Sequence, residues 1–350
     1  MQQYLIPPEI YGETPDNLLT QFSHFAQQPW AMLLDSAAPE HVNSRYDILV
    51  AEPLATLQAK AGCSILTDEH GAHTYNEDPF TVLNCALKRY FPKAAVSNLP
   101  FIGGALGYFG YDLGRYIEKL PATAEADISL PDMAVGFYRW ALILDKQLKQ
   151  LWYVDYHGEA EAGWQKLHAR LQHKLPASTP FSLNGNWQAN MDKTGYVARF
   201  NQVQQYLLSG DCYQINLTQR FSAHYQGDEW QAYRLLRGKN TAPFSAFIRL
   251  ANAAVISISP ERFLQLHDRD IETKPIKGTR PRGFCALTDQ AEAEALQLSE
   301  KDRAENVMIV DLLRNDIGKV SEPGSVKVPA LFAIESFPAV HHLVSTITGK

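Results

Sequence analysis

The sequence predicts an α+β fold whose sheets are largely antiparallel. Apolar, strand-like runs dominate both halves of the chain and follow one another closely, as at residues 133–138, 140–145 and 151–156. Helical periodicity is confined to a few segments between these runs, such as residues 194–209. Strands that come in runs favour antiparallel pairing, whereas strands that alternate one by one with helices favour a parallel sheet.

Each expected element follows from the spacing of its apolar residues. Alternation or a short continuous apolar run predicts a strand, and apolar residues three and four positions apart predict a helix. Helices are expected at 17–27, 81–91, 163–173, 194–209, 230–236 and 300–316. Strands are expected at 31–36, 46–51, 133–138, 140–145, 151–156, 213–221, 245–250, 254–258, 263–266 and 270–274. Gly210 supplies a stop for the helix at 194–209, and a segment rich in Pro, Ser and Asn at 174–190 is the candidate domain boundary.

The composition fits a globular protein with a substantial core. The chain has 350 residues, of which 45% are hydrophobic and 20% charged, and its formal net charge is −6. A negative chain without a long run of one sign is not expected to bind nucleic acid. Four widely spaced cysteines without a CxxC pair argue against a zinc or disulfide framework and fit a reducing compartment. The N-terminus lacks the features of a signal peptide and no apolar run is long enough for a bilayer, so we expect a cytoplasmic protein without a membrane partner.

Residues 101–112 are rich in glycine but do not form a dinucleotide-binding fingerprint. The pattern GxGxxG is absent, and no strand followed by a helix surrounds it. Glycine within a strand allows another backbone to approach closely. We therefore expect a strand with close packing here.

The stretch 274–283 places a lysine among residues that shape the backbone. Pro275 biases Lys274 toward extended geometry, and Gly278 removes a side chain beside Lys277. A lysine held in this way is a candidate amine nucleophile. Taken alone, however, a basic surface turn is the more ordinary interpretation of this stretch.

A carboxylate occupies an unusual place on the helix expected at 300–316. At about 100° per residue, the apolar residues of segment 308–313 make one arc, and Glu305 falls in its middle. An unpaired buried carboxylate is costly, so Glu305 would meet a cation, a metal or a strong donor. The alternative is an exposed acid in the first turn, favoured by the helix dipole. The helix alone leaves both interpretations open.

Two further clusters lie near the ends of expected strands. Glu261 and Arg262 form an acid–base pair just after one strand, and His341 and His342 precede another strand-like run. Neighbouring residues of an extended chain point to opposite faces, so at most one of the two histidines serves a site. A lone histidine is more often a hydrogen-bonded core residue.

Taken together, these stretches resemble the chorismate-utilising enzymes. The resemblance extends over nearly the whole chain and is carried, in the same order, by residues 33–36, 103–112, 210–221, 259–263, 275–279, 303–318 and 337–349. Anthranilate synthases of this family carry alanine where this chain has Lys277. The lysine indicates the aminodeoxychorismate branch, which serves para-aminobenzoate synthesis.

The resemblance implies a two-lobed fold in which large antiparallel sheets pack face to face as a sandwich, with helices outside. It implies an N-terminal lobe at residues 1–180 and a chorismate-binding catalytic lobe at residues 190–350. In the first lobe it implies a pocket for L-tryptophan, for which a plain strand-end turn is the alternative. The matching pocket residues are Ser36, Asn43, Ser44, Arg45, Tyr46, Pro243, Phe244 and Ser245.

The resemblance also implies roles for the residues of the second lobe. Chorismate binds through Mg²⁺, and Glu305 matches a metal-ligand position. Lys277 matches the nucleophile that attacks ring atom C2 and expels the C4 hydroxyl, and Glu261 matches the acid that assists its departure. The substrate-binding positions are matched by Gly278, Thr279 and His342.

In such a reaction ammonia from a glutamine amidotransferase subunit, component II, enters at C4. The product is 4-amino-4-deoxychorismate, a precursor of para-aminobenzoate and folate. The chemistry is consistent, because hydroxide is a poor leaving group that needs a general acid. An amine nucleophile splits one difficult substitution into two easier ones, and a cation positions the carboxylates of the ring.

The chain departs from the family at its end. Family members continue with a Gly-rich segment and a further glutamate that completes the metal site, whereas this sequence stops at Lys350. We therefore expect the C-terminal part of the fold to be missing, and the sequence leaves open whether the chain alone is active. The competing hypotheses are an anthranilate or isochorismate synthase, and an inactive fragment that binds only tryptophan or the amidotransferase.

Overall fold

The computed structural model describes residues 1–11, 13–38, 41–93, 96–175 and 177–350. The chain divides into two compact units, Met1–Leu175 with Tyr233–Lys350 and, separately, Pro176–Ala232. Every strand pairing in the described parts is antiparallel, which confirms the expected sheet type. The lobes at 1–180 and 190–350 stay a prediction, and residue 176 of the candidate boundary lies outside the described residues.

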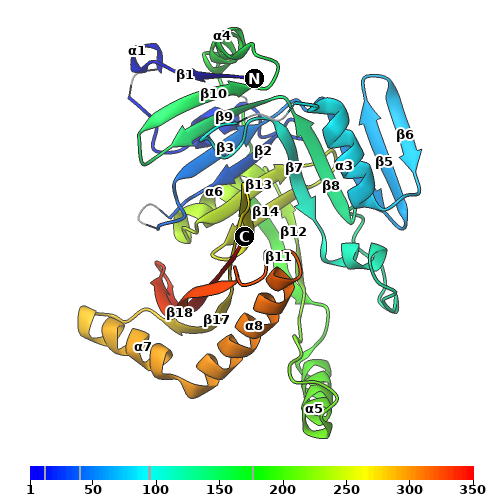
Figure 1. Ribbon diagram of the computed structural model, residues 1–350, viewed down its shortest axis with the longest axis vertical. Helices are drawn as coiled ribbons and strands as arrows, with labels where there is room; N and C mark the ends of the chain where they lie inside the picture. Colours follow the sequence, from blue (N-terminus) through cyan, green and yellow to red (C-terminus); the bar gives the residue numbers. More distant parts are fainter. Residues whose placement is uncertain (12, 39–40, 94–95, 176) are drawn as a thin grey trace. The chain divides into compact units, whose positions relative to one another are not determined.

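The larger unit contains a seven-stranded sheet that takes strands from distant parts of the chain (Figure 1). In spatial order its strands are β1 (Gln2–Leu5), β10 (Gln150–Asp155), β9 (Trp140–Asp145), β3 (Tyr46–Val50), β2 (Met32–Asp35), β13 (Phe244–Arg249) and β14 (Ala254–Ser259). Because β13 pairs with β2, Ser245 lies opposite Asp35 across the ladder. This pairing brings together the two segments that were expected to hold tryptophan.

A five-stranded sheet packs against the first one. In spatial order its strands are β6 (Gly71–Tyr75), β5 (Cys63–Asp68), β4 (Ala55–Lys60), β8 (Met133–Tyr138) and β7 (Gly104–Phe109). The side chains of β8 point alternately to the two faces of this sheet. Ala134 and Tyr138 join a core shared with the first sheet, whereas Val135 and Phe137 pack with residues of α3 (Pro79–Tyr90). The two sheets thus form the predicted sandwich with a helix outside (Figure 1).

The glycines of β7 allow the close approach that the sequence predicted. A Cβ atom built on Gly107 would lie 2.0 Å from the carbonyl oxygen of Ala134 and 2.7 Å from the Cα atom of Val135. No side chain can occupy that space, so the position requires glycine. The interpretation of residues 101–112 as a strand region is therefore confirmed for β7.

A third sheet carries the lysine stretch. In spatial order its strands are β15 (Arg262–His267), β16 (Asp270–Lys274), β19 (Val340–Gly349) and β17 (Ile276–Pro281), and β18 (Lys327–Ser336) also pairs with β19. Two helices, α7 (Ala286–Leu298) and α8 (Glu300–Gly318), lie together against β17, β18 and β19 (Figure 1). The hydroxyl of Ser299 accepts a hydrogen bond from the backbone N–H of Asp302 and so caps the N-terminus of α8, which begins at the first residue of the helix predicted at 300–316.

The remaining helices are short or flank the sheets. They are α1 (Pro8–Tyr11), α2 (Leu19–Ser23), the 3₁₀ helix η1 (Tyr111–Tyr116), α4 (Ala160–Leu171) and α6 (Glu229–Lys239). The smaller unit contains β11 (Ser182–Ala189), α5 (Lys193–Ser209) and β12 (Phe221–Gln226). Gly210 ends α5 in the left-handed conformation, with φ 80°, as predicted.

One expected strand is wrong and several elements were not foreseen. Of residues 213–221, all of which the structure describes, only Phe221 belongs to a strand. Alternating side chains define two faces, but a strand also needs a ladder of backbone hydrogen bonds with a neighbouring strand, and residues 213–220 belong to no such ladder among the described residues. The sequence patterns did not predict β1, β4, β5, β6, β11, β17, β18, α1, η1 or α7.

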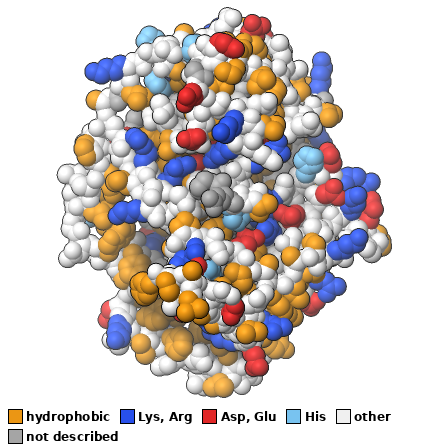
Figure 2. Space-filling view, turned by 90° about the vertical axis from the view of Figure 1, so that its left-hand side faces the viewer, with side chains coloured by type: hydrophobic (Ala, Val, Ile, Leu, Met, Phe, Trp, Pro, Cys, Tyr) orange, Lys and Arg blue, Asp and Glu red, His pale blue; other side chains and the backbone are white. Residues whose placement is uncertain are grey.

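The surface carries mixed charge. Over the face seen in Figure 2, basic and acidic side chains are interspersed, without a continuous field of one sign. Among the described residues, no helix combines the length and the apolar character needed to cross a bilayer.

Candidate active site

The lysine stretch forms an irregular strand. The register of β17 against β19 shifts at Lys277 and Gly278. Gly278 has φ +89°, which side chains rarely adopt, and a Cβ atom there would lie 2.9 Å from Asp302 Cβ and 3.0 Å from Leu296 Cδ1. We call this β-bulge at Lys277 and Gly278 the lysine bulge. A β-bulge changes the direction of a side chain and is common beside active sites. Glycine is required here because α7 and α8 approach the backbone directly beside Lys277.

Glu261 reaches the same strand from the turn after β14. Its Oε1 accepts a hydrogen bond of 3.0 Å from the backbone N–H of Ile276. The half-buried Lys277 donates from Nζ to the carbonyl oxygen of Ile276, also at 3.0 Å. A carboxylate from the turn between β14 and β15 and an amine from β17 therefore both bond to the backbone of Ile276.

His342 joins this group from β19. It pairs across the ladder with Thr279, and its Nδ1 lies 2.9 Å from the Thr279 hydroxyl oxygen. Burial lowers the pKa of His342 from its ordinary value, although the carboxylate of Glu261 and a hydrogen bond with the backbone of Gly278 act in the opposite direction. The imidazole is therefore mainly neutral at pH 7, and a neutral imidazole has one donor and one acceptor nitrogen for hydrogen bonding.

The neighbouring histidine faces away from the lysine. His341 is buried, with Nε2 at 2.9 Å from Asp289 Oδ1 and Nδ1 at 2.8 Å from the Ser336 hydroxyl oxygen. Asp289 in turn receives two hydrogen bonds from the guanidinium of Arg282. His341 thus ties α7 to β19, and only His342 joins the lysine bulge, as the alternation of an extended chain predicted.

Helix α8 presents a different face to the sheet than predicted. Met308 and Leu312 were expected in a buried apolar arc, but their side chains are 37% and 55% exposed, so that prediction is wrong. Glu305 is half-buried and therefore does not lie in the middle of an apolar contact. The reason is that polar side chains fill the part of the interface nearest β17, which hydrophobic periodicity cannot detect. The buried residues of α8 are Asp302, Asn306, Val310 and Ile317.

The described residues do not assemble a complete metal site. Among them, no group of three or more His, Cys, Asp or Glu side chains is arranged to hold a metal ion. Glu305 offers one carboxylate, while Asp302, one turn earlier, pairs with Arg280 at 3.2 Å. Magnesium requires six oxygen ligands and is usually held by one or two carboxylates, substrate and water. A single carboxylate such as that of Glu305 would therefore supply one ligand of a magnesium site, and substrate and water would have to supply the others.

The residues expected to hold tryptophan lie around the ends of β2, β3 and β13. The hydroxyl of Ser36 donates to the carbonyl oxygen of Tyr46 at 2.7 Å. The hydroxyl of Ser245 donates to the carbonyl oxygen of Ala242 at 3.1 Å. By contrast, the buried hydroxyl of Ser44 has no hydrogen-bond partner among the described residues. Of the three hydroxyls, that of Ser44 is the one without a partner in the described part of the chain.

Other members of this predicted pocket are engaged within the protein. Arg45 forms a bidentate pair with Asp145, the shorter contact being 2.8 Å. The amide oxygen of Asn43 accepts a hydrogen bond of 2.8 Å from Arg262. Binding of tryptophan here stays a prediction. Two further residues of the predicted tryptophan pocket lie at the beginning of β13: Pro243 directly precedes the strand, and Phe244 is its first residue.

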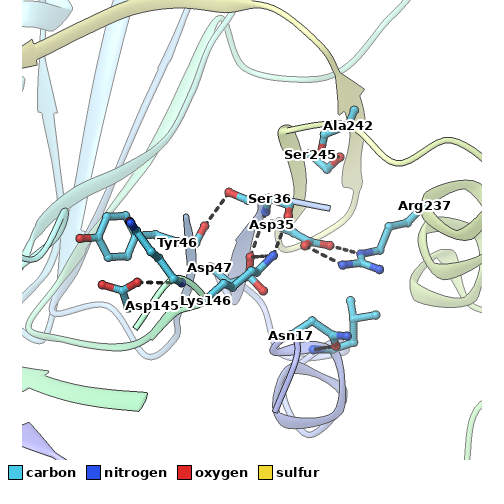
Figure 3. A network of polar contacts seen from close by, with 12 residues as sticks. Asn17, Asp35, Ser36, Tyr46, Asp47, Asp145, Lys146, Arg237, Ala242 and Ser245 are labelled. Carbon is cyan, nitrogen blue, oxygen red and sulfur yellow. Dashed lines mark hydrogen bonds and ion pairs between the residues drawn. The ribbon is translucent and has the colours of Figure 1, made fainter. Parts of the chain in front are cut away.

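Two buried aspartates beside this region were not foreseen from the sequence (Figure 3). Asp35, at the end of β2, accepts hydrogen bonds from the guanidinium of Arg237 and the hydroxyl of Tyr233. Asp47, on β3, pairs with Lys146 at 2.7 Å. Each carboxylate is matched by a cation because an unpaired buried charge is costly. Burial raises the pKa of Asp47 to about 6, against the effect of the Lys146 ammonium and reinforced by the Asp35 carboxylate.

We predict that Asp47 makes stability depend on pH. Its pKa is higher in the folded protein than in the unfolded chain, so its contribution is fully present below about pH 4 and is lost as the pH rises through 6. The difference in unfolding free energy between the wild type and Asp47→Asn should therefore fall by roughly 2–3 kcal/mol between pH 4 and pH 7.

Urea denaturation at several pH values measures this difference. Lys146→Met is a second variant to measure. Without the ammonium, the pKa of Asp47 in the folded protein should rise further, so the loss of stability should extend to higher pH. Identical pH profiles for the wild type and Asp47→Asn would contradict the prediction.

A second unforeseen group lies beside His342. The ring of Phe337 stacks on His41 at 5.2 Å between centroids and meets His342 edge-on at 5.3 Å. His41 Nε2 lies 3.1 Å from one oxygen of Glu335, and Lys274 reaches the other oxygen. Burial acts to raise the pKa of Glu335, but the hydrogen bonds from His41 and Lys274 outweigh it and hold the pKa at about 2. A lone histidine in a turn gives no sequence signal for such a contact.

Comparison with known proteins identifies the family to which this chain is similar. A family model described as chorismate binding enzyme matches residues 31–350. Aminodeoxychorismate synthase component 1 of Klebsiella aerogenes is 52% identical over 338 residues, covering 96% of this chain and 74% of the relative. The protein of the same name from Escherichia coli (strain K12) is 50% identical over 330 residues, covering 94% and 72%. The crystal structure of anthranilate synthase component I from Streptococcus pneumoniae TIGR4 matches with a TM-score of 0.77 at 27% identity, covering 89% of this chain and 70% of that chain.

The chain therefore belongs to the chorismate-binding enzyme family. Within that family, the resemblance to aminodeoxychorismate synthase component I expected from Lys277 is confirmed by the two relatives at about half identity. The α+β fold with antiparallel sheets is confirmed by the match to the solved anthranilate synthase component I.

Proposed function

We propose that this chain aminates chorismate at C4 to give 4-amino-4-deoxychorismate, the reaction for which its relatives at about half identity are named. The observation that carries the proposal is the convergence of Glu261, Lys277 and His342 on one bulged strand. They come from three separate segments of the chain. A general acid, a nucleophile and a substrate-binding imidazole are the groups that this substitution requires.

In the proposed reaction Lys277 acts as a covalent nucleophile. Its neutral amine forms a bond to C2, the ring double bonds shift, and the bond between C4 and oxygen breaks. Glu261 in its acid form gives a proton to the departing hydroxyl, which leaves as water. Ammonia then bonds to C4, the double bonds shift back, and the bond between C2 and the lysine nitrogen breaks, which regenerates the amine.

The other residues of the bulge are proposed to bind the ring. Thr279 and His342 are hydrogen-bonded to one another, and their hydroxyl and imidazole would contact the ring that Lys277 attacks. Gly278 is proposed to take part through its backbone, because side chains of α7 and α8 occupy the space where a Cβ atom would lie. Glu305 is proposed as a single ligand for Mg²⁺, which would neutralise substrate carboxylates.

The proposal also covers the source of the ammonia, the pathway that uses the product and the cell compartment. The relatives carry the name component 1, which supports the existence of a second component. We propose that this partner is a glutamine amidotransferase that supplies ammonia, and that the product serves para-aminobenzoate and folate synthesis in the cytoplasm.

Product analysis tests the proposed function. The protein is incubated with chorismate, an ammonium salt and Mg²⁺, with and without the amidotransferase, and the products are separated by liquid chromatography with mass detection. An aminated product that keeps the enolpyruvyl group supports the proposal. Anthranilate, isochorismate or unchanged chorismate as the sole outcome would overturn it.

We further propose that the first lobe binds L-tryptophan at the predicted pocket, supported by the unpartnered buried hydroxyl of Ser44. A ligand that satisfies this hydroxyl gains a hydrogen bond, so Ser44→Ala should weaken tryptophan binding roughly 5–10-fold. Isothermal titration calorimetry measures the affinity. A wild-type protein that releases no heat with tryptophan at millimolar concentration would refute the proposal.

A further inference from the structure

We propose that Asn306 and Ser345 form a buried polar anchor that sets the register of α8 against β19 and so positions Glu305 and the lysine bulge. This inference rests on the proposed amination. Both side chains are polar, yet both residues are 0% exposed. A satisfied polar pair in a core can select a single arrangement where apolar packing would accept several.

The contacts of Asn306 reach two points on β19. The hydroxyl of Ser345 donates to Asn306 Oδ1 at 2.6 Å, and Asn306 Nδ2 donates to the carbonyl oxygen of Leu343 at 3.4 Å. Leu343 directly follows His342 on this strand. If α8 slid or turned by one residue, both bonds would break and leave buried polar groups unsatisfied, which is costly.

The hydroxyl of Ser345 also serves a strained point of β18. Phe332 has φ 60°, in the left-handed region that bulky residues avoid. It lies within a break of register between β18 and β19, and its backbone N–H donates to Ser345 Oγ at 3.2 Å. The guanidinium of Arg303, on α8, lies 4.8 Å from the centroid of the Phe332 ring. Because strain of this kind persists only where the surroundings impose it, β18 is part of the same anchor.

A second polar contact ties α8 to the strand of the lysine bulge. One turn before Asn306, the carboxylate of Asp302 pairs with Arg280 of β17 at 3.2 Å. Its side chain fits against the bulge because Gly278 has no Cβ. Asp302 and Asn306 are four positions apart and share one face of the helix. Glu305, which lies between them in sequence, is thereby located relative to both β17 and β19.

Apolar contacts alone would not locate α8 in this way. Further along the helix, Val310 and Ile317 pack in a small cluster with Ile347 of β19. Such contacts favour burial but have no direction, so they tolerate a shift along the strand. The polar anchor therefore fixes where α8 lies along β19, and the apolar cluster stabilises the contact by burying Val310 and Ile317.

A double variant separates positioning from stability. Asn306→Leu with Ser345→Ala removes both polar partners, and Val310→Ala is the matched control because it removes buried apolar contact from the same helix face. The double variant is expected to lower kcat for amination by about 100-fold, the cost of a displacement near 1 Å, with KM little changed. Val310→Ala is expected to lower the urea midpoint while leaving kcat within about 2-fold.

Hydrogen exchange supplies a readout that does not need turnover. The amide of Phe332 bonds to Ser345 Oγ, so Ser345→Ala should speed its exchange at least about 10-fold, whereas Val310→Ala should speed it much less. Wild-type kcat in the double variant, or unchanged exchange at Phe332 in Ser345→Ala, would overturn the anchor. If the wild type yields no aminated product, the proposed function fails, and the exchange measurement still decides whether the anchor exists.

Discussion

Replacing Lys277 with alanine is expected to abolish the covalent adduct with chorismate and to lower kcat for amination by roughly 10³-fold or more. The amine is the group that bonds to C2 in the proposed reaction, and alanine offers no substitute. Intact-protein mass spectrometry measures the adduct after chorismate is added without ammonia. The wild type should gain the mass of chorismate less one water.

Lys301→Ala is the matched control for this experiment. Lys301 is an exposed lysine on α8, so its removal changes the net charge equally but leaves the bulge intact. It should form the adduct as the wild type does. An adduct on the Lys277→Ala protein would show that another group is the nucleophile, and an unchanged kcat would refute the covalent route.

Gly278→Ala is expected to lower the free energy of unfolding by about 2–5 kcal/mol. Two effects add here: a left-handed backbone costs an alanine about 1–2 kcal/mol, and crowding a packed contact costs about 1–3 kcal/mol more. The new Cβ would lie 2.9 Å from Asp302 Cβ and 3.0 Å from Leu296 Cδ1, so α7 and α8 must move away from the bulge. Urea denaturation measures the loss of stability.

Gly158→Ala isolates the backbone effect from the crowding effect. Gly158 has φ +91°, nearly the same as Gly278 at +89°, but a Cβ atom there would have no neighbour within 4 Å. It should lose only the 1–2 kcal/mol or so of backbone strain. Equal losses at the two positions would show that the helices do not press on the bulge.

Much of the sandwich could be predicted because its signals are local. Strands such as β8 and β9 are continuous apolar runs, and their burial on both faces agrees with that pattern. The strand expected at 213–221 failed for a different reason. Its alternation is as regular as that of a true strand, but pairing depends on a partner elsewhere in the chain, which a local pattern does not specify.

The residues of the candidate site likewise divide into those that the sequence could single out and those that depend on contacts between distant segments. Lys277, Glu261 and His342 could be singled out from residue type, spacing and resemblance to a family, and the structure brings all three to one strand pair. The contact of His41 with Glu335 could not be predicted, because the two residues lie far apart in sequence. The burial of Asn306 likewise depends on which face α8 turns toward β19.

Residue order and type were enough to predict the antiparallel α+β class and the family, and to single out Lys277 as the candidate nucleophile, since these follow from short-range periodicity and from motifs that stay together along the chain. Packing between distant segments was needed to decide which face of α8 is buried, which of the two histidines meets the lysine bulge, and how buried aspartates are neutralised. The physical reason is that burial and hydrogen-bond pairing depend on every surface that meets at a point, whereas periodicity reports only how one segment divides its own side chains.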